Sequence, residues 1–119
     1  MSSNLGGSML SDYRYKFIVS YVDGMALDAV WLYIQDDAGD YFERKSLFLW
    51  VLRGLLDERV IVAGKHGRQF SEKVDEIANM FESAFPESES GLDDGIWFFS
   101  EACPAGIGWI GQDGNVYWT

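Results

Sequence analysis

The sequence GIGWIGQDGNVYW, residues 106–118, contains two short apolar runs separated by a turn. Both runs are rich in β-branched and aromatic residues, which favour strands. Asp113-Gly114 is typical of a tight hairpin, because a type I′ turn needs positive φ at both central residues. The stretch therefore predicts two antiparallel strands at the end of the sequence.

Two further strands are predicted upstream of this hairpin. Ile96-Trp97-Phe98-Phe99 is one, and Val60-Ile61-Val62-Ala63, bounded by glycines, is the other. Residues 86–95 between them hold almost no apolar side chain, so we expect a solvated, mobile acidic loop. Together these segments predict a small, mostly antiparallel sheet of three to four strands.

The remaining segments carry helical periodicity. The first helix is expected to begin at the N-cap Ser11 and to end at Asp23-Gly24, and a second to end at Asp36–Gly39. A third starts near Asp40 and runs for about five turns, and Ser71 caps a fourth that stops at Pro86. Their apolar stripes are Tyr13, Phe17 and Tyr21; Leu27, Val30, Trp31 and Ile34; the all-apolar run 47–52; and Val74, Ile77, Ala78, Phe81 and Phe85.

The predicted fold class is α+β, with about four helices packed on the small C-terminal sheet. A chain of 119 residues, 48% of them hydrophobic, builds one domain, which we place at residues 9–119. Residues 1–8 are expected to be a flexible tail or a remnant left by cloning. The lone cysteine implies no internal disulfide. Without a secretory signal or a long apolar run, we expect a cytoplasmic protein that does not enter the membrane.

The charge is distributed unevenly along the chain. Nine basic and ten acidic residues lie at or before Lys73, whereas residues 74–119 hold nine acidic residues and no basic one. Phosphate backbones and anionic membranes are therefore disfavoured ligands, and a basic partner fits better. A plain solvated surface is the alternative, although such surfaces usually mix both signs.

Other chemistries find little support in the motifs. His66 and Cys103 are the only histidine and cysteine, so they form the one possible nucleophile and base of a small hydrolase. The simpler interpretation makes Cys103 a buried apolar residue and His66 part of a basic loop. Neither the motifs nor the spacing of the acidic residues predicts a metal site or a cofactor. One aromatic set is expected to form the core face of the sheet: Trp97, Phe98, Phe99, Trp109, Tyr117 and Trp118.

A longer pattern resembles a family of small acidic bacterial proteins. It comprises Ala84-Phe85-Pro86, an acidic linker, Ile96–Phe99, Cys103–Gly106, Trp109 and the ending DGNVYWT, with residues 24–31 and Leu55-Leu56 upstream. Such proteins look like immunity proteins of contact-dependent growth inhibition systems. The resemblance implies no enzymatic activity. It implies tight binding to the C-terminal domain of a cognate toxin, often a nuclease, in the cytoplasm of the producing cell.

The resemblance transfers no binding residue, so the predicted partner-binding residues rest on charge. We expect the following acidic residues to attract a basic toxin domain, by standing in for the phosphates that a nuclease binds: Asp75, Glu82, Glu87, Glu89, Asp93 and Asp94. The protein is expected to be a monomer that forms a heterodimer with the toxin. A non-catalytic adaptor for an unknown partner is the alternative, followed by the small hydrolase.

Overall fold

The computed structural model describes residues 9–119, so the predicted tail at residues 1–8 lies outside the described part. The fold is α+β, as predicted. The helices are α1 (Asp12–Val22), α2 (Leu27–Tyr33), α3 (Tyr41–Asp57) and α4 (Val74–Ala84), with 3-10 segments η1 (Gln35–Asp37) and η2 (Glu89–Phe99). The strands are β1 (Ile61–Lys65), β2 (Arg68–Gln69), β3 (Gly106–Ile110) and β4 (Val116–Trp118).

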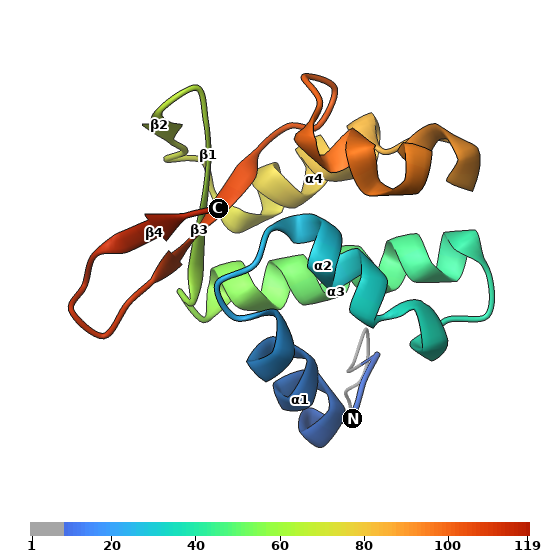
Figure 1. Ribbon diagram of the computed structural model, residues 1–119, viewed down its shortest axis with the longest axis horizontal. Helices are drawn as coiled ribbons and strands as arrows, with labels where there is room; N and C mark the ends of the chain where they lie inside the picture. The colour runs from blue at the N-terminus through green and yellow to red at the C-terminus, as the bar shows by residue number, and fades with distance from the viewer. Residues whose placement is uncertain (1–8) are drawn as a thin grey trace.

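Helix α3 lies at the centre of the molecule (Figure 1). Asp40 caps it by accepting a 2.8 Å hydrogen bond from the backbone N–H of Glu43. Helices α2 and α4 and strand β1 all pack against α3. Its buried side chains are Leu47, Phe48, Val51, Leu52, Leu55 and Leu56. A helix with apolar residues on most sides takes this position because its neighbours cover every apolar face.

The four described strands form one antiparallel sheet in the order β2-β1-β3-β4. Gly64 pairs with Gly106 and Val62 with Gly108 between β1 and β3. Ile107 and Trp109 of β3 point into the core, and the indole N–H of Trp109 donates to the carbonyl of Met25 at 2.8 Å. This bond ties the sheet to the segment that precedes α2.

Two hairpin turns differ from expectation. At Asp113-Gly114 only Gly114 has positive φ, 84°, and its N–H donates to the carbonyl of Gly111 at 2.9 Å, so the predicted type I′ turn is wrong. The two-residue turn with positive φ at both positions joins β1 to β2 instead, at His66 (54°) and Gly67 (77°). Strand β2 itself was not predicted.

The predicted strand at Ile96–Phe99 is wrong, because these residues end η2. Trp97 and Phe98 are both buried, whereas Ile96 and Phe99 are exposed. Successive side chains of a strand point to opposite faces, so a strand could not bury both Trp97 and Phe98 on one face. The expected acidic loop is helical in part, because η2 begins at Glu89 and is interrupted by the non-helical residues Asp93–Gly95. Leu92, its one large apolar residue, is only 2% exposed and anchors the segment to the core.

Helix boundaries also needed correction. Ser11 caps α1 as predicted, accepting from the backbone N–H of Arg14 at 3.0 Å. The cap of α4 is Lys73 rather than Ser71, and the carboxylate of Glu76 accepts from the backbone N–H of Lys73 at 2.8 Å.

The apolar stripe predicted for α1 faces the solvent. Tyr13, Phe17 and Tyr21 are 80%, 39% and 51% exposed, and the buried side chains of α1 are Tyr15, Ile18 and Val22. The exposed rings contact one another in sequence, with centroids 6.5 Å apart for Tyr13–Phe17 and 4.7 Å apart for Phe17–Tyr21. We call these three rings the α1 aromatic row.

No helix among the described residues is long and apolar enough to cross a bilayer.

Candidate functional site

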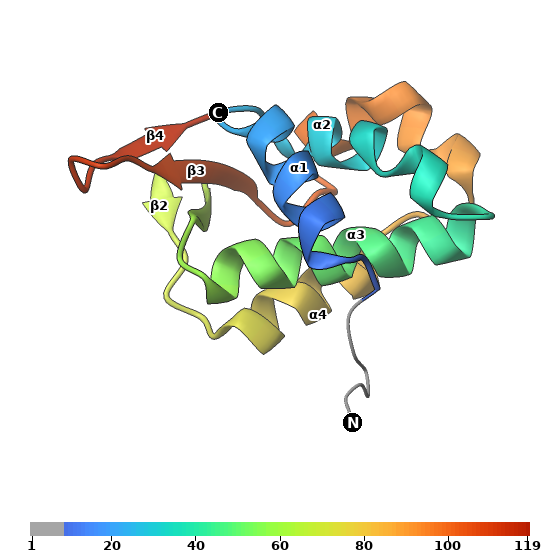
Figure 2. The same ribbon diagram turned by 90° about the horizontal axis from the view of Figure 1, so that it is seen from below.

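The six predicted partner-binding residues do not form one compact patch. Asp75 and Glu82 lie on α4, which packs on α3, whereas Glu89, Asp93 and Asp94 lie on η2, which packs on α2 (Figure 2). Glu87 lies in the connection between the two elements. The six residues are therefore divided between two elements of the surface and the connection that joins them.

Two of the six carboxylates have basic neighbours on α3. Asp75 forms an ion pair with Arg53. Glu89 lies 3.8 Å from a guanidinium nitrogen of Arg44. A carboxylate next to a base presents less net charge to an approaching partner.

The other four are exposed, and the described part of the chain gives them no ion pair: Glu82, Glu87, Asp93 and Asp94. Asp93 (φ 49°), Asp94 (54°) and Gly95 (94°) adopt three successive left-handed conformations, which we call the acidic turn. Left-handed backbone is costly for most residues and least so for Gly, Asn and Asp. The turn places both aspartates on the surface, between the buried Leu92 and the buried Trp97.

Sequence reasoning missed three residues beside the acidic turn. A Cβ on Gly95 would lie 3.8 Å from the Cβ of Asp28, so Asp28 of α2 borders the turn. Ile96 and Phe99 are 61% and 67% exposed on η2, where they add apolar surface. Ile96 and Phe99 are three residues apart, so a helical turn places them on one face. This spacing was the only sequence signal for their shared exposure.

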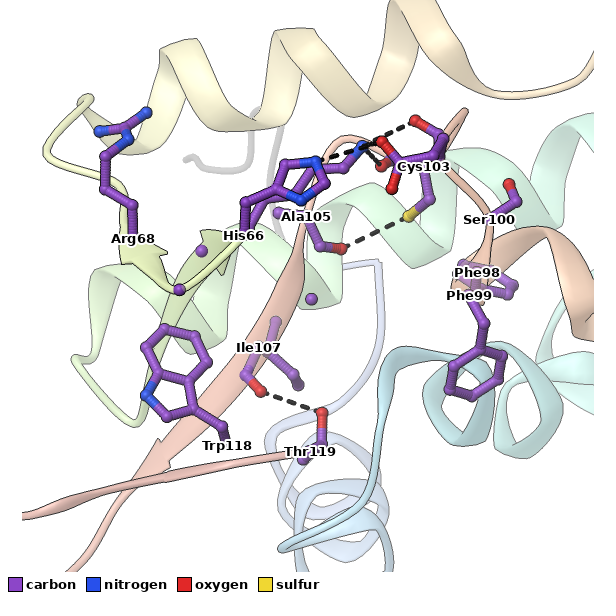
Figure 3. Close-up of a pocket in the computed structure, with 15 residues that line it drawn as sticks. His66, Arg68, Phe98, Phe99, Ser100, Cys103, Ala105, Ile107, Trp118 and Thr119 are labelled. Atoms are coloured by element: carbon purple, nitrogen blue, oxygen red, sulfur yellow. Dashed lines mark hydrogen bonds and ion pairs between the residues drawn. The ribbon is translucent and has the colours of Figure 1, made fainter.

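A cavity of about 420 Å³ lies between the sheet and the end of η2 (Figure 3). It is lined by the β1–β2 turn, the start of β3, the end of β4 and the segment that follows η2. His66 and Cys103 both line it, although 37 positions separate them in sequence. Strand pairing between Gly64 and Gly106 brings their segments together.

Lys65 holds the segment after η2 against the sheet. Its ammonium group donates to the carbonyl oxygens of Glu101 at 2.6 Å and Cys103 at 2.7 Å. Charge-assisted hydrogen bonds of this length are strong, so Lys65 fixes this side of the cavity.

His66 and Cys103 do not bond to each other. Nε2 of His66 lies 3.1 Å from Oε1 of Glu101, and Sγ of Cys103 lies 3.4 Å from the carbonyl oxygen of Ala105, to which it donates. Burial raises the pKa of the Cys103 thiol, and a protonated thiol is a poor nucleophile. The geometry therefore gives no support to a hydrolase built on these two residues. The expectation that Cys103 is a buried apolar residue is confirmed, since it is 2% exposed.

Three members of the predicted aromatic set are buried, but only Trp109 lies on the core face of the sheet, since Trp97 and Phe98 belong to η2. Trp97, Phe98 and Trp109 are buried. Phe99, Tyr117 and Trp118 are 67%, 55% and 51% exposed. Phe99 and Trp118 both line the cavity. Among the described residues, no group of three or more histidine, cysteine, aspartate or glutamate side chains is placed to hold a metal ion.

The region that carries both the acidic turn and the cavity defines a bacterial protein family. Residues 56–119 match the model of a family described as "protein of unknown function, DUF596", and the chain belongs to this family. All six predicted partner-binding residues and every cavity residue fall within the match.

The whole fold also has a solved relative. The chain is similar to an uncharacterized protein conserved in bacteria, from Neisseria meningitidis, with 26% identity and a TM-score of 0.79. The similarity covers 89% of this chain and 87% of that one. No curated protein matches the chain. The two similarities establish the family and the fold, and they assign no activity.

Proposed function

We propose that this protein is an immunity protein of a contact-dependent growth inhibition system. In this role it binds the C-terminal domain of a cognate toxin in the cytoplasm and blocks it without catalysis. The resemblance described in the sequence analysis motivates the toxin as partner. The acidic turn of Asp93, Asp94 and Gly95 is the observation that carries the proposal.

The acidic turn has the two components of a protein interface. Asp93 and Asp94 supply negative charge, and the neighbouring Ile96 and Phe99 supply exposed apolar surface, 61% and 67% respectively. Interfaces combine a few apolar or aromatic anchors with a polar rim that fixes orientation. An exposed Ile and Phe within six residues of two aspartates fit that arrangement.

The chemistry of the partner follows from the charge. A nuclease toxin presents Lys, Arg or His side chains where it binds phosphate, and carboxylates can occupy those positions. Opposite charge on the two proteins also speeds association, by about tenfold to a thousandfold at low salt. We therefore assign the steering role to Glu82, Glu87, Asp93 and Asp94, and a smaller role to the ion-paired Asp75 and Glu89.

The test is an association-rate measurement between the purified protein and the toxin domain encoded by the neighbouring gene. In the test variant Glu87→Gln, Asp93→Asn and Asp94→Asn are combined. Asparagine tolerates left-handed backbone, so the acidic turn keeps its conformation. We expect the rate constant at low salt to fall about tenfold or more, and its dependence on salt to weaken.

The matched control combines Asp23→Asn, Asp57→Asn and Glu72→Gln, three exposed positions outside α4 and η2. It changes the net charge by the same amount. We expect it to lower the rate by less than about threefold, because steering depends on where the charge lies. Equal effects of the two variants would reduce the role of the turn to bulk charge, and failure of the toxin domain to bind would overturn the proposal.

A further inference from the structure

Strand β4 forms one edge of the sheet, and the described part of the chain places no strand on its outer side. In Figure 2 the β3–β4 hairpin extends beyond the helices, and no described element runs beside the outer side of β4. Proteins usually protect an edge strand with charge, proline or a covering element. The opposite edge, β2, is only two residues long and includes Arg68. By contrast, the residues of β4, Val116–Trp118, include neither a charge nor a proline.

The bonds between β3 and β4 show which backbone groups of β4 are free. The N–H of Thr119, next to the end of β4, donates to the carbonyl of Ile107 at 3.1 Å. Hydrogen-bonded positions alternate along an antiparallel ladder, so Tyr117 is the residue within β4 that bonds to β3. The N–H and C=O groups of the intervening Val116 and Trp118 therefore point outward. No described residue bonds to these groups.

The two aromatic side chains of β4 leave these backbone groups accessible. A Cβ on Gly64 would lie 2.7 Å from the indole of Trp118, and a Cβ on Gly108 would lie 3.0 Å from it. Glycine at both positions therefore lets the indole lie across β3 toward β1. The ring of Tyr117 points back along the hairpin, where its hydroxyl donates to Oδ2 of Asp113 at 2.5 Å. Both rings thus lie away from the outer edge.

The free groups of β4 match those of a second β4 strand that runs antiparallel to it. When a twofold axis passes beside Tyr117, Val116 of each copy lies opposite Trp118 of the other copy. Each such pair exchanges two N–H···O=C bonds, so every outward group of the two residues gains a partner. Each pair also places a β-branched side chain opposite an aromatic one, which is a favourable cross-strand combination. The edge is therefore complementary to itself.

The surroundings of β4 leave room for this arrangement. Tyr117 lies on the same face of the sheet as the core but is 55% exposed, so its own chain leaves this side of β4 uncovered. The segment η2, which holds the acidic turn, lies at the opposite end of the molecule from the β3–β4 hairpin in both views (Figures 1 and 2). Repulsion between the acidic turns of two copies is therefore weak, because charges farther apart than about 8 Å are largely screened at physiological salt.

We propose that a second copy of this chain binds at this edge, and that the two β4 strands pair antiparallel to join both sheets into one. The contact involves three residues of each strand. Because so small an interface buries little surface, we expect a weak dimer with a dissociation constant of about 10–500 µM. The expected monomer thus becomes one side of a monomer–dimer equilibrium. The acidic turns lie outside the paired edge, so the dimer neither requires nor excludes the proposed binding of a toxin.

Sedimentation velocity of the full chain, from about 5 µM to about 1 mM, measures this equilibrium by mass action. We expect the weight-average mass to rise from that of a monomer toward that of a dimer as the concentration increases. Added NaCl should strengthen the dimer, because salt screens the repulsion between two acidic chains. The same change should slow the association of an acidic protein with a basic toxin, so the two interactions respond to salt with opposite signs.

Val116→Pro is the blocking variant. It removes an outward N–H and adds a ring at the edge, while the bonds from β4 to β3 are kept, so we expect the dissociation constant to rise more than about tenfold. Gln69→Pro on β2 is the matched control. The N–H of Gln69 also points outward, because the neighbouring Phe70 is the residue that donates to the carbonyl of Ala63, at 2.8 Å. This control should leave the dimer unchanged, and thermal unfolding shows whether each variant keeps the fold.

Tyr117→Cys tests the register of the pairing without a proline. In the proposed dimer the two copies of position 117 face each other as a non-hydrogen-bonded pair, with Cα atoms about 4.5 Å apart, which a disulfide can span. Oxidised glutathione should therefore link the two copies, as seen by non-reducing electrophoresis. Gln69→Cys, on the opposite edge, is the control and should link at least about fivefold more slowly. Cys103 is 2% exposed, so it does not compete.

Three results would overturn the proposal. The first is a monomeric mass at every concentration, and the second is an unchanged dimer in folded Val116→Pro. The third is a Tyr117→Cys variant that links no faster than Gln69→Cys, and this comparison decides the matter if Val116→Pro does not fold. A dimer that is lost in Tyr13→Ser but kept in Val116→Pro would place the contact on the α1 aromatic row and would equally overturn pairing through β4.

Discussion

The guanidinium of Arg44 on α3 lies over the indole of Trp31 on α2, with its central carbon 4.2 Å from the ring centroid. The same group donates to the carbonyl oxygen of Trp31 at 3.1 Å and 2.6 Å. Carbonyls in the last turn of a helix have no partner within the helix. Arg44 therefore supplies the missing donor for α2 and fixes α2 on α3.

Replacing this arginine should destabilise the protein markedly. Arg44→Met keeps the apolar stem but removes the charge and both donors, so we expect the free energy of unfolding to fall by about 2–3 kcal/mol. Arg44→Lys should lose about half of that, because an ammonium cannot reproduce the planar fork. Urea denaturation followed by Trp fluorescence measures both. A loss below about 0.5 kcal/mol for Arg44→Met would contradict this role.

Two glycines on one face of β3 should respond oppositely to the same substitution. Gly108→Ala brings a Cβ against Val116 and within 3.0 Å of Trp118, so we expect a loss of about 1–3 kcal/mol in the free energy of unfolding. Gly106→Ala meets no atom and should be neutral or stabilising by up to about 1 kcal/mol, since alanine restricts the unfolded chain. Thermal unfolding of the two variants gives the comparison.

A double mutant tests the cause of the Gly108 effect. If the clash is with the indole, Gly108→Ala should cost less unfolding free energy when Trp118→Ala is also present. The effect of Gly106→Ala should be the same with and without Trp118→Ala. Additive losses in the Gly108 and Trp118 double mutant would show that the clash with Val116, rather than with the indole, causes the loss.

Lys65 should stabilise the wall of the cavity locally. Lys65→Met removes two charge-assisted hydrogen bonds to the carbonyls of Glu101 and Cys103, and we expect a loss of about 1–3 kcal/mol. Hydrogen exchange of the amides at residues 100–103 should accelerate more than exchange in α3, because the opening is local. Lys16→Met is the control, since Lys16 forms an exposed i,i+4 ion pair with Asp12, and it should cost less than about 0.5 kcal/mol.

Tyr15 should make the protein sensitive to alkali. Burial, helped by Glu58, raises the pKa of the Tyr15 phenol, whose hydroxyl donates to Oε1 of Glu58 at 3.1 Å. In the unfolded chain a tyrosine ionises near pH 10, so above that pH the unfolded state loses a proton that the folded state keeps. The stabilisation from this group is complete below about pH 10 and falls by up to about 1.4 kcal/mol per pH unit above it.

Tyr15→Phe isolates this group. At neutral pH it should cost about 0.5–1.5 kcal/mol through the lost hydrogen bond. Between pH 10 and about pH 11.5 the advantage of the natural protein over the variant should shrink, because only the natural protein carries the Tyr15 phenol. Tyr41, whose pKa burial also raises, is present in both proteins and cancels from the difference. A constant difference across this range, measured by urea denaturation, would contradict the assignment.

Periodicity predicted helices well where one apolar stripe was present. In α2 the stripe of Leu27, Val30, Trp31 and Ile34 is buried throughout. Helix α1 carries two stripes at helical spacing, and the more aromatic one faces the solvent. Composition could not choose between them, because the choice depends on how α1 packs on α2.

The segment 96–99 failed for a related reason. A run of four apolar residues bounded by turn residues fits a strand or a helical turn equally well. The preceding left-handed residues Asp93–Gly95 decide the outcome, and their conformation is not encoded in the apolar pattern.

The sequence identified the chemistry of the surface better than its geometry. The acidic character of residues 74–119 was evident from composition, but the bases that neutralise Asp75 and Glu89 come from α3, far upstream. His66 and Cys103 were recognised as singular residues. Their shared cavity, and the bond from His66 to Glu101, arise from the pairing of β1 with β3 and could not be derived locally.

The burial of Cys103 has a practical consequence for measuring complexes of this protein. The chain contains one cysteine, and its thiol is 2% exposed with a raised pKa, so surface reagents react with it slowly. A cysteine introduced at the exposed Ser83 of α4 would therefore be labelled selectively without removing the native thiol. A fluorophore at this position would serve as one end of a molecular ruler, and energy transfer to a labelled partner would report how far α4 lies from the contact surface.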